Sequence, residues 1–124
     1  PMLKPALDTM NLDSVDLLFL ENVGNLVCPA EFDTGATCSI MLLSVPEGDD
    51  KVLKYPLMFT VCDLLLVTKT DCQAMFDFDL KKLTTRVHQL NPDMKIIPVS
   101  SKTGENMEAW ISWLKERREA FIKN

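Results

Sequence analysis

The sequence predicts an α/β fold in which a parallel sheet is flanked by helices, and three observations lead to this class. Four short apolar runs, at residues 15–20, 37–45, 64–67 and 95–99, have the length and composition of buried strands. Segments whose apolar residues recur at helical spacing lie between these runs. Polar loops follow the runs, as expected where parallel strands end at one edge of a sheet. Strands that alternate with helices indicate a parallel sheet.

The N-terminal third begins with a predicted helix at residues 4–11, where the apolar side chains have helical spacing. The run 15–20 follows as a buried strand that ends at Glu21. Residues 26–33 are predicted to be irregular, because Pro29 excludes a long helix there.

The middle of the chain is predicted to hold a polar, turn-rich loop at 46–50 and a short helix around 55–60, with Pro56 in its first turn. After the strand 64–67, Asp77 is the predicted N-cap of a longer helix. Its apolar face is Leu80, Leu83, Val87 and Leu90, and Asn91-Pro92 ends it.

The C-terminal part is predicted to contain one strand and one helix. Pro98 removes a backbone donor from the run 95–99, which places this strand at the edge of the sheet. Asn106 is the predicted cap of the last helix. The predicted buried side of that helix is Met107, Trp110, Ile111, Leu114 and Phe121.

Length and composition limit the classes of function. The 124 residues are 47% hydrophobic and 25% charged, which fits one globular domain with a sizeable core. A net charge of −5 provides no basic surface for nucleic acid. No apolar run approaches the roughly 20 residues of a membrane-spanning helix, so no membrane association is expected. The four cysteines are not spaced as CxxC pairs and are interpreted as reduced thiols of a cytoplasmic protein.

The stretch Thr68-Lys69-Thr70-Asp71 directly follows the most apolar strand, at the edge where ligands bind to parallel sheets. A carboxylate at Asp71 can accept two hydrogen bonds from N1 and N2 of guanine, whereas adenine has no such pair of donors. The methylene stem of Lys69 can lie over the purine face. The alternative is an ordinary strand exit with solvated polar side chains, and these four residues alone do not separate the two interpretations.

This stretch resembles the guanine-specificity motif of GTPases, Asn-Lys-x-Asp, with Thr68 in place of the Asn. Two further loops, at 21–25 and 100–104, also follow predicted strands and should emerge at the same edge. Together the three loops are similar to the third, fourth and fifth motifs of a GTPase, in the same order. Each loop has an ordinary alternative as a strand end or a turn, but the three in register favour nucleotide binding.

The resemblance implies roles for single residues. Ser101-Lys102 resembles the Ser-Ala-Lys motif, whose backbone amide meets guanine O6. Glu21 would orient Mg²⁺ through water. Gly24 would let its backbone N–H approach the γ-phosphate, because it has no Cβ in the way.

Three segments, at 21–33, 54–59 and 98–104, sharpen the resemblance to the nickel-insertion GTPase family HypB of [NiFe]-hydrogenase maturation. The likeness runs from about residue 11 to the end and implies a partial P-loop NTPase fold of the SIMIBI class. In that family a Cys in the Asn-Leu-Val-Cys-Pro segment binds nickel or zinc at the dimer interface, and Cys28 occupies this position. Without the resemblance, a small buried thiol would be the favoured interpretation.

The chain departs from the family in one large respect, because its 124 residues contain no Gly-x-x-x-x-Gly-Lys-Ser/Thr phosphate loop. Together with a first residue that is Pro1, this leads us to expect that residues 1–124 are the C-terminal portion of a single GTPase domain. This portion alone is not expected to hydrolyse GTP. In GTPase sheets the phosphate-loop strand lies between the strand that ends at Glu21 and the strand that ends at Val45. Without it, we expect the fragment to close the gap between these two strands, by direct pairing or by exchange with a second copy.

The resemblance also implies cofactors and partners for the parent protein. These are GTP or GDP, Mg²⁺, and Ni²⁺ or Zn²⁺, a homodimer, a HypA-like accessory protein and the hydrogenase large subunit. Two alternatives stay open: a non-catalytic scaffold or binding module that has lost nucleotide binding, and a GTPase similar to the urease accessory protein UreG.

Overall fold

A computed structural model of the chain describes residues 17, 19 and 38–123. The elements, in chain order, are β1 (Ile40–Ser44), η2 (Val45–Glu47, a 3-10 helix), α3 (Lys51–Lys54), α4 (Pro56–Val61), β2 (Leu64–Thr68), η3 (Thr70–Met75, a 3-10 helix), α5 (Leu80–Leu90), β3 (Lys95–Pro98) and α6 (Met107–Lys123). Strands therefore alternate with helices, and the predicted α/β class is confirmed.

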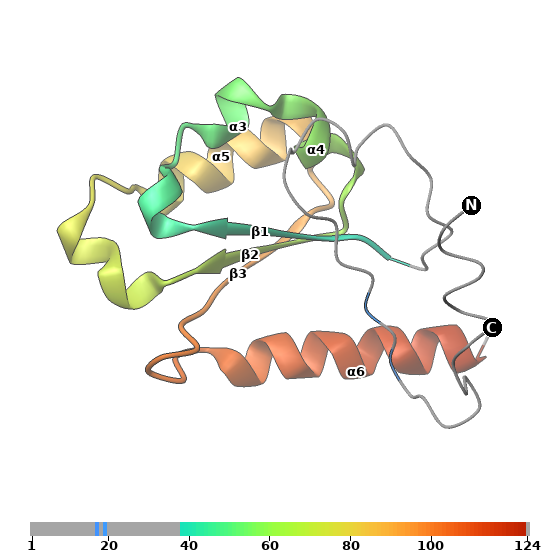
Figure 1. Ribbon diagram of the computed structural model, residues 1–124. Helices are drawn as coiled ribbons and strands as arrows, with labels where there is room; N and C mark the ends of the chain where they lie inside the picture. Colours follow the sequence, from blue (N-terminus) through green and yellow to red (C-terminus); the bar gives the residue numbers. More distant parts are fainter. Residues whose placement is uncertain (1–16, 18, 20–37, 124) are drawn as a thin grey trace, which may run out of the picture.

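The described part of the chain forms a three-stranded parallel sheet in the order β1-β2-β3 (Figure 1). Leu64 lies opposite Ile40 on one side and Lys95 on the other, so β2 is the central strand. Helices α3, α4 and α5 cover one face of the sheet, and α6 covers the other (Figure 1). Cover on both faces explains why β2 is apolar and buried from Leu64 to Val67.

Two hydrophobic clusters form the core, one on each face of the sheet. Leu65 and Val67 of β2 face α3, α4 and α5, where they join Phe59 and Leu83. Leu64 and Leu66 face α6. This alternation follows from the two-residue period of a strand, and Leu64, Leu65 and Val67 are all 0% exposed. The sheet is thus held rigidly at its centre.

Helix α5 begins two residues later than the sequence indicated, and the prediction of Asp77 as its N-cap is wrong. The cap is Asp79, whose Oδ1 accepts hydrogen bonds from the backbone N–H groups of Lys81 (3.0 Å) and Lys82 (3.2 Å). Asp79 is in turn fixed by the preceding segment, since its own N–H donates to Asp49 Oδ2 at 2.6 Å. The predicted end at Asn91 is confirmed.

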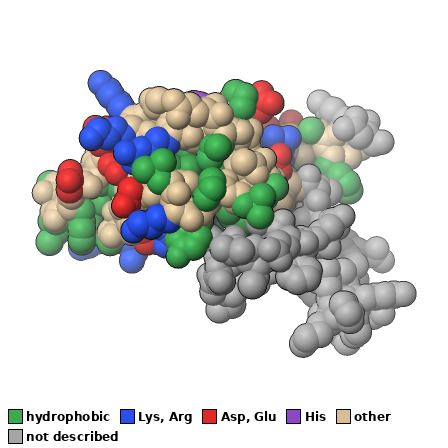
Figure 2. Space-filling view, turned by 90° about the horizontal axis from the view of Figure 1, so that it is seen from above, with side chains coloured by type: hydrophobic (Ala, Val, Ile, Leu, Met, Phe, Trp, Pro, Cys, Tyr) green, Lys and Arg blue, Asp and Glu red, His purple; other side chains and the backbone are tan. Residues whose placement is uncertain are grey.

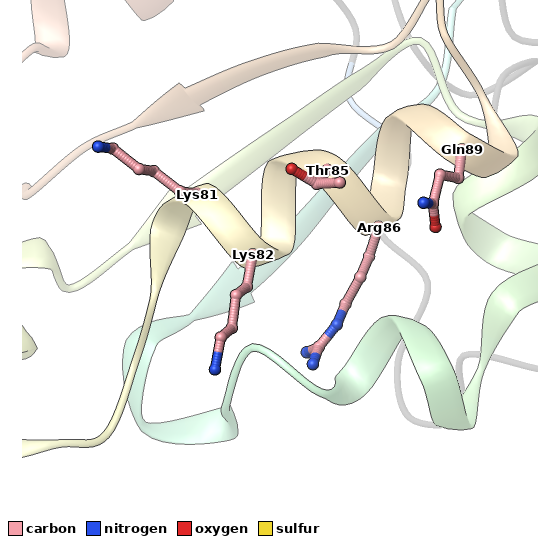
Figure 3. A pocket seen from close by; sticks show the side chains of 5 residues that line it. All are labelled: Lys81, Lys82, Thr85, Arg86 and Gln89. Atoms are coloured by element: carbon pink, nitrogen blue, oxygen red, sulfur yellow. The ribbon is translucent and has the colours of Figure 1, made fainter.

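The same Asp49 ties the η2–α3 loop to α5 through a second contact. Arg86 Nη1 donates to the Asp49 backbone oxygen at 2.9 Å and lies 3.3 Å from Asp49 Oδ1. Figure 3 shows the Arg86 side chain reaching from α5 toward this segment. A shallow pocket beside it is lined by Lys81, Lys82, Thr85, Arg86 and Gln89. The turn-rich loop predicted at 46–50 is confirmed: it contains the end of η2 and a turn, and the short helix α3 follows it.

The outer surface of α3, α4 and α5 carries both acidic and basic side chains (Figure 2). Basic and acidic side chains lie close together toward one end of it, with hydrophobic side chains between them (Figure 2). Exposed apolar residues of α3 and α4, Leu53, Leu57 and Val61, are part of this surface.

Helix α6 buries part of the predicted set, since Met107, Trp110 and Leu114 pack against the core as predicted. Trp113, which was not in the predicted set, is 8% exposed and packs with Leu64 and Leu66. Ile111 and Phe121 are 43% and 64% exposed, so their predicted burial is wrong. The core of this face is contacted by Met107, Ala109, Trp110, Trp113 and Leu114, all in the first half of the helix. Phe121 lies more than one turn beyond this contact.

Two further predictions about helices and strands are confirmed, and one is wrong. The helix with Pro56 in its first turn is confirmed, and β3, with Pro98 at its end, pairs only with β2 in the described sheet. Leu17 and Phe19 belong to no strand and are 44% and 61% exposed. At these two positions the predicted buried strand 15–20 and its direct pairing are wrong. The remaining residues of that run, and residues 4–11 and 26–33, lie outside the described part.

Replacing Asp79 with Ala is expected to destabilise the protein by about 1 kcal/mol, because two N–H groups at the start of α5 lose their acceptor. Asp77→Ala is the matched control, since Asp77 is an exposed carboxylate two residues away. Urea unfolding of both variants checks this. Equal loss in the two variants would contradict the assignment of Asp79 as the cap.

Candidate functional site

The end of β2 turns sharply into the segment that carries Asp71. Lys69 has a φ of 60° and lies in the left-handed region, which non-glycine residues rarely adopt. The Cys72 N–H donates to the Lys69 backbone oxygen at 3.0 Å and closes the turn. As a result Asp71 leaves the carboxyl edge of the sheet as an exposed side chain.

The loop after β3 is closed on itself around Ser100. This residue is 0% exposed, and its backbone oxygen accepts the Gly104 N–H at 2.8 Å. Its Oγ accepts the Thr103 N–H at 3.2 Å. Gly104 has a φ of +80°, a conformation in which a side chain would be strained, so a glycine is required at this turn.

These two loops are joined directly. The sheet register continues past the strands, because Val99 N–H donates to the Val67 backbone oxygen at 2.7 Å and Thr70 N–H donates to Val99 at 3.3 Å. Ser100 Oγ then donates to Asp71 Oδ1 at 2.8 Å. Two of the three loops predicted to meet at one edge of the sheet therefore do meet.

Asp71 is held in its charged form. The hydrogen bond from Ser100 lowers the pKa of its carboxyl below the usual range and outweighs the slight desolvation that raises it. The thiol of Cys72 and the positive charge of Lys102 also lower this pKa. At neutral pH the site thus presents an exposed carboxylate, which is a pure hydrogen-bond acceptor.

Some of the predicted site residues lie in the described part of the chain, and the others lie outside it. Thr68, Lys69 and Asp71 lie at the end of β2, and Ser101 and Lys102 are exposed in the adjoining loop. The other predicted residues, Glu21, Gly24 and Cys28, lie outside the described part of the chain.

Ser100 was missed by the sequence prediction, which named Ser101. A signal was present, because the spacing Ser100-Ser101-Lys102 places Ser100, and not Ser101, at the first position of a Ser-x-Lys motif.

Among the described residues there is no cluster of metal-binding side chains and no helix that could cross a membrane. No group of three or more His, Cys, Asp or Glu side chains that could hold a metal ion occurs among them. Cys38, Cys62 and Cys72, the cysteines of the described part, form no disulfide. Burial raises the pKa of the buried Cys62 thiol to about 11, so it stays protonated. No helix in this part of the chain is long and apolar enough to cross a membrane.

Comparison with known proteins defines the class first. The fold is similar to a crystal structure of HypB from Helicobacter pylori in complex with nickel, with a TM-score of 0.91 and 40% identity over 96% of this chain and 57% of that chain. This likeness confirms the predicted P-loop NTPase type of fold. A family model described as "CobW/HypB/UreG, nucleotide-binding domain" matches residues 2–98.

The chain belongs to this CobW/HypB/UreG family. Hydrogenase maturation factor HypB of Azotobacter chroococcum is 49% identical over 107 residues, which are 86% of this chain and 35% of that protein. Hydrogenase/urease maturation factor HypB of H. pylori is 40% identical over 121 residues, covering 94% of this chain and 50% of that protein. The resemblance to HypB is thereby confirmed, and the chain spans half or less of the length of these relatives.

Replacing Ser100 with Ala is expected to raise the pKa of the Asp71 carboxyl, because its strongest donor is lost. A folded-state pKa below the unfolded value adds stability above the unfolded pKa, and this is lost as pH falls through the folded pKa. Ser100→Ala should therefore lose part of the unfolding free energy that Asp71 contributes above its unfolded pKa and that disappears at acid pH. Carbon-detected NMR titration of Asp71 measures this, with Ser101→Ala as the matched control. An unchanged Asp71 pKa in Ser100→Ala would contradict the assignment.

Proposed function

We propose that residues 1–124 form the C-terminal portion of a GTPase domain and supply its guanine-recognition half. The observation that carries the proposal is the Ser100–Asp71 hydrogen bond of 2.8 Å, which joins the loops after β2 and β3 and leaves an ionised carboxylate open to a ligand. A polar site at the carboxyl edge of a parallel sheet is where such folds bind nucleotides.

The chemistry of Asp71 favours guanine over adenine. Its carboxylate would accept hydrogen bonds from N1–H and N2–H of guanine, and adenine offers neither at that edge. The exposed Lys69 would lay its stem along the base. The backbone at Ser101 and Lys102 would meet guanine O6. Thr68 retains a hydroxyl at the position of the usual Asn but has no amide.

The phosphate side of the nucleotide is assigned to the N-terminal part of the chain. Glu21 would orient Mg²⁺ through water, and the backbone N–H of Gly24 would approach the γ-phosphate of GTP. Support comes from the nucleotide-binding family model, whose match begins at residue 2 and spans both positions. Hydrolysis also needs a phosphate loop, which these 124 residues lack, so we assign GTP hydrolysis to the longer parent protein.

Nickel handling in hydrogenase maturation is the proposed role of that parent protein. The relatives are named hydrogenase maturation factors, and one similar structure is described as a complex with nickel. Cys28 would bind Ni²⁺ or Zn²⁺ at the interface of a homodimer, since a thiolate suits either ion. The parent would act in the cytoplasm with a HypA-like accessory protein and deliver nickel to the hydrogenase large subunit.

A second candidate is a binding module without nucleotide function. Thr68 in place of the Asn of the guanine-specificity motif favours it. In that case the sheet edge would keep its shape, and Asp71 would respond to no nucleotide.

Amide NMR titration of the 124-residue chain with GDP and then ADP separates these functions. The expected result is shifts at Lys69, Asp71 and Ser101 with GDP only. Asp71→Asn should abolish them, because an amide cannot accept both guanine hydrogens in the same way. Asp77→Asn is the matched control and should leave them unchanged. Equal responses to GDP and ADP, or none to either, would contradict guanine recognition by this chain.

A further inference from the structure

The turn that carries Asp71 places a thiol against the second oxygen of the same carboxylate. Cys72 Sγ lies 3.6 Å from Asp71 Oδ2, within range of an S–H···O hydrogen bond. Ser100 Oγ donates to the other oxygen, Oδ1, at 2.8 Å. The two carboxylate oxygens therefore have separate donors, one from each side of the site.

The backbone explains how adjacent side chains come to meet. The left-handed Lys69 turns the chain directly after β2, and the Cys72 N–H closes the turn on the Lys69 oxygen at 3.0 Å. The 3-10 geometry that follows winds tightly. In this turn Cys72 is half-buried and Asp71 is exposed.

We propose that Cys72 is a positioning residue for guanine recognition: its thiol holds Asp71 Oδ2 while Ser100 holds Oδ1, so that the carboxylate is fixed before the base arrives. This inference rests on the proposed guanine-binding function. It adds a residue that no part of the guanine-specificity motif includes.

The hydrogen-bond capacity of a carboxylate permits this arrangement. Each oxygen has two lone-pair sites, so one protein donor on each leaves one site for N1–H or N2–H of the base. Fixing the carboxylate in advance reduces the ordering that binding would otherwise require. A thiol is a weak donor, so its share should be smaller than that of Ser100. Lys102 supplies a positive charge to the same carboxylate, and the variants described below leave it in place.

The first test measures the Asp71 carboxyl in the 124-residue chain without nucleotide, by carbon-detected NMR titration. Cys72→Ala should raise the pKa of Asp71, and Cys72→Ser should return it toward the wild-type value, because a hydroxyl is again a donor. Gln73→Ala is the matched control, an exposed neighbour in the same turn, and should change nothing. A Cys72→Ala variant whose Asp71 titrates as in the wild type would overturn the proposal.

The second test measures nucleotide affinity in the same variants. Cys72→Ala should weaken GDP binding about twofold to fivefold, the effect of one weak hydrogen bond, and Cys72→Ser should restore it. Unchanged GDP affinity in Cys72→Ala would overturn the role in recognition. If the wild-type chain binds neither GDP nor ADP, the proposed function fails, and the nucleotide-free titration alone decides whether Cys72 holds Asp71.

Discussion

The hydrogen bond between Ser100 and Asp71 is the interaction on which the candidate site depends. It joins residues 29 positions apart in the chain, from the loops that follow two neighbouring strands. It is also the largest cause of the lowered pKa of the Asp71 carboxyl. The two loops are also joined by the backbone hydrogen bond from the Thr70 N–H to the Val99 oxygen.

The parallel sheet makes this interaction possible. Val67 lies opposite Pro98 in the ladder between β2 and β3, and the next backbone bond, from Val99 to Val67, is 2.7 Å long. Parallel register therefore brings both loops out at the same height. The apolar core on both faces of β2 keeps that register, since a slip by one residue would turn Leu64, Leu65 and Val67 to the wrong faces.

Much of the fold could be predicted from the sequence because the deciding signals are local. The apolar run of β2, a proline in the first turn of α4 and Asn91-Pro92 after α5 each determine their own element. The failures depend on contacts between distant segments. Asp79 caps α5 where Asp77 was expected, and Asp79 is anchored by Asp49, 30 positions away. Sequence spacing does not contain that information.

In the candidate site, too, local signals could be predicted from the sequence and contacts between distant segments could not. Asp71 and Lys69 were predicted from their place directly after a buried strand. Ser100 was missed because two serines are adjacent and the prediction used the second of them. The Ser-x-Lys spacing favours Ser100, and the structure shows that Ser100 is buried. Phe121 was wrongly predicted to be buried, because only the first half of α6 contacts the core.

A double-mutant cycle on Asp71 and Ser100 tests the central claim most directly. Urea unfolding at neutral pH of Asp71→Ala, Ser100→Ala and the double variant measures the coupling free energy between the two side chains. The expected result is that the double variant is less destabilised than the sum of the single variants, because each substitution removes the same hydrogen bond. Additive effects would mean that the two loops are not joined through these side chains, and would contradict the account of the site.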